Sequence, residues 1–248
     1  MLVIHKFCTS TDEAKPIIMT GNVLVNDKVI DKPGTNCNES DEIRIKTKNK
    51  QFVSRSGDKL FNFLQTTDLN IENRICLDIG ISTGGFTDVL LQQSANHILG
   101  IDVAYGLTDF SIRQKQNVSL LERTNARYLT KKILATALEK NHLIINDISL
   151  VTMDVSFISA FKIIPTLIEL LSKSTEYIIL IKPQFEGEQH MIEKGGIITN
   201  SNYINQILEK VTHEFQSLNL EIKATAPSKV KGTKGNQEYF YHCKLANT

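Results

Sequence analysis

The sequence predicts an α/β protein with a mostly parallel central sheet flanked by helices, and a small α+β unit in front of it. From Arg74 onward, short apolar segments of strand length alternate with segments of helix length, which is the pattern of βαβ units. Before that point, one short helical pattern is followed by the alternation and turn residues of a small antiparallel sheet. The length of 248 residues allows one or two domains with a substantial core.

Residues 1–48 are expected to form the small unit. A helix is expected to begin at Ser10 or Thr11, which are cap-forming residue types. Two short strands then flank the turn residues Asn26 and Asp27, and residues 42–46 alternate like a half-exposed strand. Residues 49–58 are interpreted as a basic linker.

Residues 59–248 are expected to form the larger domain. Its expected helices include residues 86–93 and 158–171. Its expected strands cover residues 74–79, 97–103, 118–121, 150–154, 177–181, 220–224 and 238–244. Ligands of such folds bind beyond the carboxyl ends of the parallel strands, so residues that end these strands are the first candidates for a functional site.

Charge is balanced overall but unevenly distributed. The chain has 28 Lys and Arg residues against 27 Asp and Glu residues, so its net charge does not indicate a nucleic-acid-binding protein. Two segments, residues 44–50 and 223–234, nevertheless carry four basic residues each and no acidic one. Such segments are either solvated faces or contacts for a polyanion.

The cysteine and hydropathy patterns indicate a cytoplasmic protein. The four cysteines are scattered without the spacing of a zinc site, which favours free thiols in a reducing compartment and predicts no metal site. The N-terminus lacks the apolar segment of a signal peptide, and no apolar run approaches the roughly 20 residues of a membrane-spanning helix. We therefore expect no membrane partner.

The segment "CLDIGISTGGF", residues 76–86, predicts a nucleotide-binding loop between a strand and a helix. Gly80 permits a sharp turn, and Gly84 and Gly85 let a ligand approach the backbone. The spacing matches neither a dinucleotide fingerprint nor a phosphate-binding P-loop. Asp102 ends the next strand, where a carboxylate can accept both ribose hydroxyls of an adenosine. A loop without phosphate-binding spacing, together with a ribose-binding carboxylate, suggests an adenosine without pyrophosphate, as in S-adenosylmethionine. Taken alone, the loop also fits a tight turn, and Asp102 also fits a solvent-exposed acid.

These motifs and several others resemble the TlyA family, also called haemolysin A, whose members are similar to FtsJ-type ribose 2′-O-methyltransferases with a small RNA-binding module in front. The matching segments follow the family order across roughly residues 22–243 and are "NVLVNDKVIDKPG" (22–34), "FVSRSGDKL" (52–60), "LDIGISTGGFTDVLLQ" (77–92), "GIDVAYG" (100–106), "LLERTNARYLT" (120–130), "DVSFIS" (154–159), "IKPQFE" (181–186), "KGGII" (194–198) and "KGTKGNQEYF" (231–240). The resemblance implies a Rossmann-like S-adenosylmethionine-dependent methyltransferase fold and methyl transfer to a ribose 2′-hydroxyl, in a cytidine of ribosomal RNA.

The resemblance also implies a catalytic tetrad. The family pattern of Lys, Asp, Lys and Glu falls on Lys59, Asp154, Lys182 and Glu238. Asp154 and Lys182 end consecutive predicted strands, so they should meet at the edge of the sheet. A lysine takes the proton of a hydroxyl only when it is neutral, and burial beside another cation favours that form. We therefore interpret Lys182 as the base and Lys59 as the neighbouring cation. Alternatively, Lys182 closes the sheet edge and pairs with Glu186.

The other candidate residues follow from the same resemblance. Cofactor-binding residues are expected at Asp78, Gly80, Thr83, Gly84, Gly85, Phe86, Asp102 and Asn125, although Asp78 could instead only brace the loop. RNA-contacting residues are expected at Lys46, Lys48, Lys50, Arg55, Lys229, Lys231 and Lys234. The expected partners are ribosomal RNA and ribosomal subunits, and the reaction requires no metal.

Two other functions compete with this interpretation. The older family name implies a cytolysin, but a pore requires amphipathic or membrane-length apolar segments, and none stands out. A non-catalytic ribosome-binding factor with a vestigial cofactor pocket is the other alternative. The four intact tetrad positions argue against it.

Overall fold

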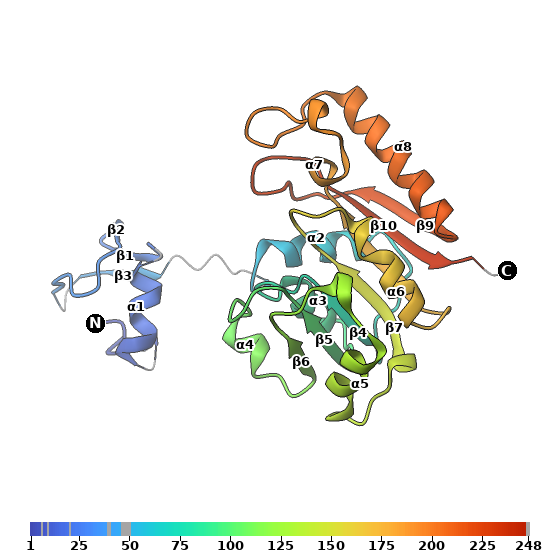
Figure 1. Ribbon diagram of the computed structural model, residues 1–248. Helices are drawn as coiled ribbons and strands as arrows, with labels where there is room; N and C mark the ends of the chain where they lie inside the picture. Colours follow the sequence, from blue (N-terminus) through green and yellow to red (C-terminus); the bar gives the residue numbers. More distant parts are fainter. Residues whose placement is uncertain (6, 9, 20, 39–40, 46–50, 247–248) are drawn as a thin grey trace. The chain divides into compact units, whose positions relative to one another are not determined.

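The computed structural model describes residues 1–5, 7–8, 10–19, 21–38, 41–45 and 51–246. The chain divides into two compact units, Met1–Lys50 and Gln51–Thr248 (Figure 1).

The front unit consists of one helix and a three-stranded antiparallel sheet. Helix α1 spans Thr11–Met19, and the strands β1 (Val23–Val25), β2 (Lys28–Ile30) and β3 (Ile43–Ile45) are ordered β2-β1-β3. Asn26 and Asp27 join β1 to β2 with φ of 48° and 64°, as a two-residue hairpin requires. The expected helix, hairpin and third strand are therefore confirmed. Their shared core consists of Leu2, Cys8, Ala14, Val23 and Ile43.

The larger unit is a doubly wound α/β fold around a seven-stranded sheet. The strand order is β6-β5-β4-β7-β8-β10-β9, in which the first five strands are parallel and β10 is antiparallel to both of its neighbours. The strands are β4 (Ile75–Ile79), β5 (His97–Ile101), β6 (Val118–Leu121), β7 (Ile148–Met153), β8 (Glu176–Ile181), β9 (Leu220–Pro227) and β10 (Tyr239–Leu245). The predicted fold class is confirmed.

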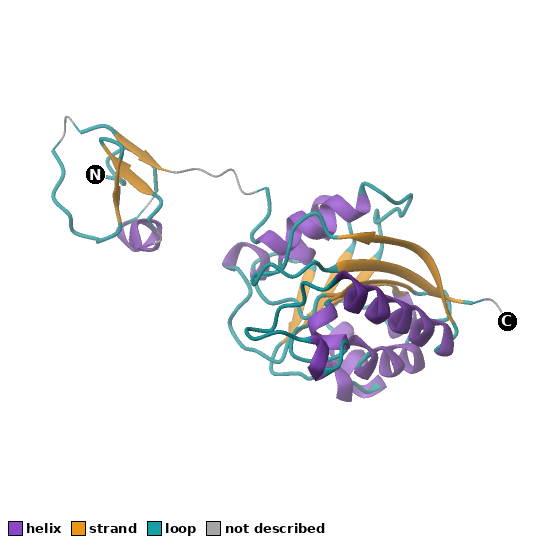
Figure 2. Ribbon diagram, turned by 90° about the horizontal axis from the view of Figure 1, so that it is seen from above, coloured by secondary structure: helices purple, strands orange, loops and turns teal. Residues whose placement is uncertain are grey.

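Helices cover both faces of this sheet (Figure 2). In β4, Leu77 and Ile79 belong to one buried cluster and Cys76 to another, because successive side chains of a strand point to opposite faces. The first cluster is closed by α5 (Lys131–Glu139), α6 (Ile164–Leu170) and α8 (Ser201–Ser217). The second is closed by α2 (Arg55–Leu64) and α3 (Gly85–Gln92). The short helices α4 (Phe110–Arg113) and α7 (Pro183–Glu186) follow β5 and β8.

The larger unit begins earlier than the expected residue 59. Helix α2 starts at Arg55, and Phe52 is buried in the hydrophobic cluster that α2 closes. Residues 52–58 are therefore part of this unit and do not form the expected linker.

The helix expected at residues 158–171 is also shorter than predicted. A single 3-10 turn, Ala160–Lys162, comes first, and α6 begins at Ile164. Pro165 explains this start, because a proline is accepted in the first turn of a helix but disrupts a helix interior.

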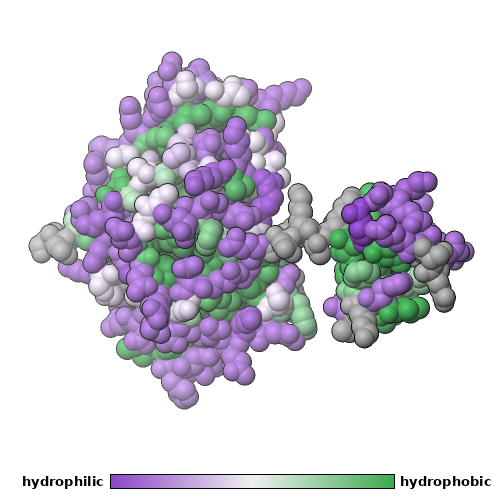
Figure 3. All heavy atoms as spheres, turned by 180° about the vertical axis from the view of Figure 1, so that it is seen from behind, coloured by the Kyte–Doolittle hydropathy of each residue, from purple (hydrophilic) through white to green (hydrophobic). Residues whose placement is uncertain are grey.

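The surface of the larger unit is largely hydrophilic on the side shown in Figure 3, with hydrophobic residues grouped in places. Within the described part of the chain, every helix is too short or too polar to span a lipid bilayer.

Candidate active site

Lys182 and Asp154 meet at the carboxyl edge of the sheet. Strands β7 and β8 are parallel neighbours that end at Met153 and Ile181, so the next residues leave the sheet side by side. The Nζ atom of Lys182 lies 2.6 Å from Oδ1 of Asp154. Lys182 is buried at 8% exposure, and within the described residues Oδ1 of Asp154 takes part in this ion pair but accepts no well-aligned hydrogen bond. A buried lysine at this edge is thus held by a carboxylate.

Lys59 and Glu238 form a second buried pair at the same edge. Glu238 directly precedes β10, whose Tyr239 lies opposite Ile181 of β8, so continuing the register places Glu238 opposite Lys182. Lys59, in the second turn of α2, donates from Nζ to Oε2 of Glu238 at 2.6 Å. The two side chains are 11% and 3% exposed. The structure therefore brings the four predicted tetrad residues together as two lysine–carboxylate pairs.

The alternative pairing of Lys182 with Glu186 is wrong. Glu186 is buried, and its Oε1 accepts a hydrogen bond from the backbone N–H of Ala160 at 2.8 Å. Burial raises the pKa of this carboxyl, opposed by hydrogen bonds from Ser159 and Ala160. Glu186 thus fixes the segment after β7, while Lys182 turns to Asp154.

The glycine loop lies directly beside this cluster. Gly80 has φ of 81°, and a Cβ atom at this position would lie 2.5 Å from the carbonyl oxygen of Asp154. A Cβ atom on Gly85 would lie 2.1 Å from Oγ of Ser56 and 2.3 Å from Oγ of Ser54, at the start of α2. Glycine at these two positions lets the loop approach both the end of β7 and the helix that carries Lys59.

Asp78 supports the glycine loop through hydrogen bonds in the protein interior. Its side chain is 1% exposed, and its two oxygens accept hydrogen bonds from the hydroxyls of Thr87 and Thr152 at 2.7 and 2.8 Å. Burial raises the pKa of Asp78 to about 6, although the two threonine hydrogen bonds act in the opposite direction. The expectation that Asp78 binds the cofactor is therefore corrected: the side chain faces the interior and braces the loop.

Phe86 also differs from its expected role. Its side chain is buried in the cluster under α2 and α3, with its ring centroid 6.0 Å from that of Phe240. The ring of Phe86 is thus part of the hydrophobic core. Thr83 is exposed at the tip of the loop, where its carbonyl accepts the N–H of Asp109 at 3.1 Å. Gly84, with φ of 95°, precedes α3 and packs against Ile112.

Asp102 follows β5 and faces the glycine loop. Its Oδ2 accepts the N–H of Ser82 at 2.8 Å, and its Oδ1 accepts the N–H of Ala104 at 2.8 Å. The side chain is partly exposed, and each carboxylate oxygen keeps a free lone pair for a hydroxyl donor. Asn125, the exposed cap of a 3-10 turn, accepts the N–H of Arg127. The two oxygens of Asp102 could accept the hydroxyls of a ribose.

The predicted RNA-contacting residues of the larger unit lie on its surface. Lys229, Lys231 and Lys234 are exposed in the loop between β9 and β10. Arg55 donates to the carbonyl of Lys231 at 3.0 Å, which joins the start of α2 to this loop. Lys46, Lys48 and Lys50 lie outside the described residues.

The sequence did not single out one contact of Lys182. Ser156 accepts a hydrogen bond from its Nζ at 2.9 Å, and the following Phe157 has φ of 64° and is 92% exposed. Both residues lie in the quoted segment "DVSFIS", but nothing in their spacing marks Ser156 as a partner of the lysine.

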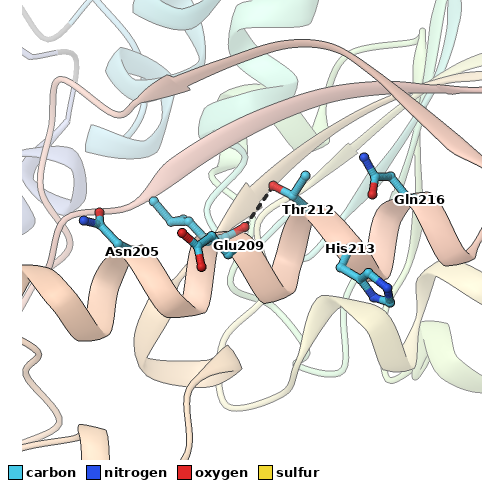
Figure 4. A pocket seen from close by; sticks show the side chains of 6 residues that line it. Asn205, Glu209, Thr212, His213 and Gln216 are labelled. Carbon is cyan, nitrogen blue, oxygen red and sulfur yellow. Dashed lines mark hydrogen bonds between the residues drawn. The ribbon is translucent and has the colours of Figure 1, made fainter.

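Other features of the larger unit do not add to this site. Within the described ranges, no group of three or more His, Cys, Asp or Glu side chains is arranged to hold a metal ion. A hollow of about 410 Å³ runs along α8, and Figure 4 shows its polar side chains Asn205, Glu209, Thr212, His213 and Gln216. The residues lining that hollow come from α8 alone, and none is a predicted site residue.

Comparison with family models assigns both parts of the chain. Residues 52–245 match the FtsJ-like methyltransferase model, and residues 1–43 match the S4 domain model.

Individual proteins are similar over nearly the whole chain. Hemolysin A of Brachyspira hyodysenteriae is 33% identical over 236 residues, which cover 95% of this chain and 94% of the relative. The 16S/23S rRNA (cytidine-2'-O)-methyltransferase TlyA of Mycobacterium tuberculosis is 32% identical over 240 residues, which cover 96% of this chain and 86% of the relative. A solved structure named "Putative hemolysin from Streptococcus thermophilus" has a TM-score of 0.75 at 32% identity and covers 98% of this chain and 85% of that one.

Proposed function

The chain belongs to the FtsJ-like methyltransferase family, and within it to the TlyA or hemolysin A proteins; from this premise we propose that it transfers the methyl group of S-adenosylmethionine to a ribose 2′-hydroxyl of ribosomal RNA. The Mycobacterium tuberculosis relative is named a cytidine-2'-O-methyltransferase of 16S and 23S rRNA, and we propose a cytidine as the target here too. The proposed partners are ribosomal subunits in the cytoplasm.

One observation carries the proposal: two largely buried lysine–carboxylate pairs lie at the carboxyl edge of the sheet, next to a glycine loop. The pairs are Lys182 with Asp154 and Lys59 with Glu238, each with a nitrogen–oxygen distance of 2.6 Å. Buried charges are costly unless they are paired, so a cluster of four at the ligand-binding edge of a parallel sheet indicates a reactive site.

The neighbouring loop supports S-adenosylmethionine as the methyl donor. Backbone groups around Gly80, Thr83 and Gly84 are proposed to hold it, Asp102 to accept its ribose hydroxyls, and Asn125 to lie near its adenine. When bound, S-adenosylmethionine supplies a methyl group on a positively charged sulfur.

The two lysines are proposed to act differently on the ribose. A 2′-hydroxyl is a poor nucleophile until its proton is removed, and we assign that proton to Nζ of Lys182. Asp154 holds the amine in place, and general-base action of this kind typically contributes about 10²–10⁴-fold. Lys59, held by Glu238, places a positive charge beside the oxygen as negative charge develops on it.

The remaining predicted residues are proposed to bind RNA. The S4 domain match and the exposed Lys229, Lys231 and Lys234 support phosphate contacts from both units. Unpaired nucleotides are the usual targets of sequence-specific RNA-binding proteins, and the reacting 2′-hydroxyl itself distinguishes RNA from DNA.

The test is methyl transfer to separated ribosomal subunits that lack the modification. We expect the purified protein to incorporate label from methyl-labelled S-adenosylmethionine, and the methylated position to resist alkaline cleavage of its 3′ phosphodiester, because a 2′-O-methyl group removes the attacking hydroxyl. Mapping the resistant position identifies the nucleotide and the subunit.

The variant Lys182→Ala is expected to bind S-adenosylmethionine like the wild type and to lose methyl transfer by about 10²-fold or more. The matched control is Lys173→Ala, an exposed lysine outside the site, which should remain active. Label on a base instead of a ribose contradicts the proposed reaction, and full activity of Lys182→Ala contradicts the proposed base.

A further inference from the structure

The amine of Lys182 has two acceptors, and only one of them belongs to the proposed tetrad. Its Nζ donates to Oγ of Ser156 at 2.9 Å and lies 2.6 Å from Oδ1 of Asp154. Both acceptors come from the short segment that leaves β7. Lys182 itself is 8% exposed, whereas Ser156 is exposed.

We propose that Ser156 is a positioning residue, which accepts one N–H bond of the neutral Lys182 amine and, together with the nearby carboxylate of Asp154, aims the lone pair of that amine at the 2′-hydroxyl. This inference rests on the proposed function. A neutral amine has two N–H bonds and one lone pair. If both N–H bonds are held by acceptors, only one direction remains for the lone pair. If one acceptor is missing, rotation about the Cε–Nζ bond lets the lone pair point elsewhere.

The same two acceptors also suit the product of the step. The proton leaves the 2′-oxygen for Nζ, and the electron pair of that oxygen forms the new bond to the methyl carbon, while the sulfur keeps the electrons of the bond it loses. The resulting ammonium has three N–H bonds. One of them points to Ser156 and another to the 2′-oxygen, while the carboxylate of Asp154 balances the positive charge.

The segment that carries Ser156 contacts α7 on its C-terminal side. Phe157 has φ of 64°, a left-handed conformation that is unfavourable for a bulky residue and persists only when surrounding contacts maintain it. Its ring centroid lies 5.4 Å from that of Phe185 in α7, the helix that directly follows Lys182. A second tie is the 2.8 Å hydrogen bond from the N–H of Ala160 to Glu186, also in α7. The acceptor and the lysine are thus fixed to the same short helix.

The test compares single-turnover methyl transfer at saturating S-adenosylmethionine in Ser156→Ala and in the isosteric pair Ser156→Thr and Ser156→Val. We expect Ser156→Ala and Ser156→Val to lower the rate about tenfold, the size of one hydrogen bond to a charged group. Ser156→Thr should retain most of the rate, because it keeps the hydroxyl. Affinities for S-adenosylmethionine and for the ribosomal subunit should stay unchanged. Ser174→Ala, an exposed serine before β8, is the matched control.

The pH profile separates positioning from a general structural role. Without Ser156 the protonated amine loses an acceptor. The pH at which the rate is half-maximal should therefore be lower in Ser156→Ala than in the wild type, and the maximal rate should be lower as well. A rate within twofold of wild type in Ser156→Ala, or equal loss in the Thr and Val variants, overturns the inference. If Lys182→Ala is inactive in that same assay, the proposed function still stands. Full activity of Lys182→Ala removes the proposed base and this inference with it.

Discussion

At the scale of single residues, the pair of Lys59 and Glu238 allows a structural role to be separated from a catalytic one. Lys59→Met leaves the Glu238 carboxylate buried at 3% exposure without its partner. Removing one member of a buried ion pair typically costs about 3–5 kcal/mol, whereas replacing both members by apolar residues is often neutral. We therefore expect Lys59→Met to lose about 3 kcal/mol of unfolding free energy and Lys59→Met/Glu238→Leu to recover most of it.

Neither of these variants should transfer methyl groups, because both lack the proposed cation beside the 2′-oxygen. Urea unfolding and the ribosomal-subunit assay measure the two properties on the same samples. If the double variant recovered activity along with stability, the pair of Lys59 and Glu238 would have a structural role and no catalytic one.

Asp78 predicts a pH dependence of stability. Burial raises its pKa from 3.8 to about 6, so between these pH values the native state binds the proton more tightly than the unfolded state. Protonation of Asp78 contributes about 3 kcal/mol to the unfolding free energy. This contribution is fully present below about pH 4 and is lost as the pH rises through 6. Asp78→Asn has no such titration.

The unfolding free energy of the wild type should therefore fall relative to that of Asp78→Asn between pH 4.5 and 7. Urea unfolding at several pH values measures this difference, with the exposed Asp68→Asn as the matched control. Parallel curves for wild type and Asp78→Asn would show that the carboxyl is not held in its protonated form.

Motif resemblance predicted the positions of the tetrad but not the direction of every side chain near it. Asp78 and Phe86 belong to the glycine-loop motif, yet both side chains face the interior. For Asp78, the inward direction of the side chain could have been predicted from the apolar strand "ICLDI". A strand buried on both faces leaves no exposed position for its fourth residue. Ser156 carried no such signal, because its hydrogen bond with Lys182 joins residues that lie 26 positions apart in the sequence.

At the scale of elements, the strands were predictable and the start of α2 was not. Short apolar runs between turn residues located the core of each strand of the seven-stranded sheet, because buried parallel strands are nearly continuous in hydrophobicity. The first turn of α2 reads "RSGD", which is polar and includes a glycine. The structure explains that glycine: a Cβ atom on Gly57 would lie 2.4 Å from Cβ of Phe52. Close packing between segments is not visible in a single sequence.

The contact between α2 and α3 gives a prediction at this scale. Gly85→Ala places a Cβ atom 2.1 Å from Oγ of Ser56 and 2.8 Å from the backbone nitrogen of Gly57, so α2 must move away. Overpacking of this kind typically costs about 1–3 kcal/mol. Because α2 carries Lys59, methyl transfer should fall along with stability.

Gln93→Ala, at the exposed end of the same helix, is the control and should change the unfolding free energy by less than about 0.5 kcal/mol. Wild-type stability and activity in Gly85→Ala would mean that the two helices do not need this close approach.

At the scale of the whole molecule, the two units have separate cores. The buried cluster of the front unit is built from residues between Leu2 and Ile43, and both clusters of the larger unit are built from Phe52 and later residues. A chain of residues 51–248 is therefore expected to fold and to bind S-adenosylmethionine like the full chain, while its KM for the ribosomal subunit rises because the proposed RNA contacts of the front unit are gone. Thermal unfolding, S-adenosylmethionine binding and steady-state kinetics measure the three properties, and an unfolded fragment would contradict the independence of the two cores.

The proposed RNA contacts of the basic segment before the larger unit predict a measurable dependence of RNA binding on salt. Each phosphate contact to single-stranded RNA contributes about 0.7 to the slope of log affinity against log salt concentration, because counterions are released on binding. If Lys46, Lys48 and Lys50 each contact a phosphate, the triple alanine variant should lower that slope by about 2. The rate constant for methyl transfer at saturating RNA should remain that of the wild type, since these lysines are proposed to act on binding alone. An unchanged slope in the triple variant would mean that these three lysines do not contact phosphates and that other basic residues do.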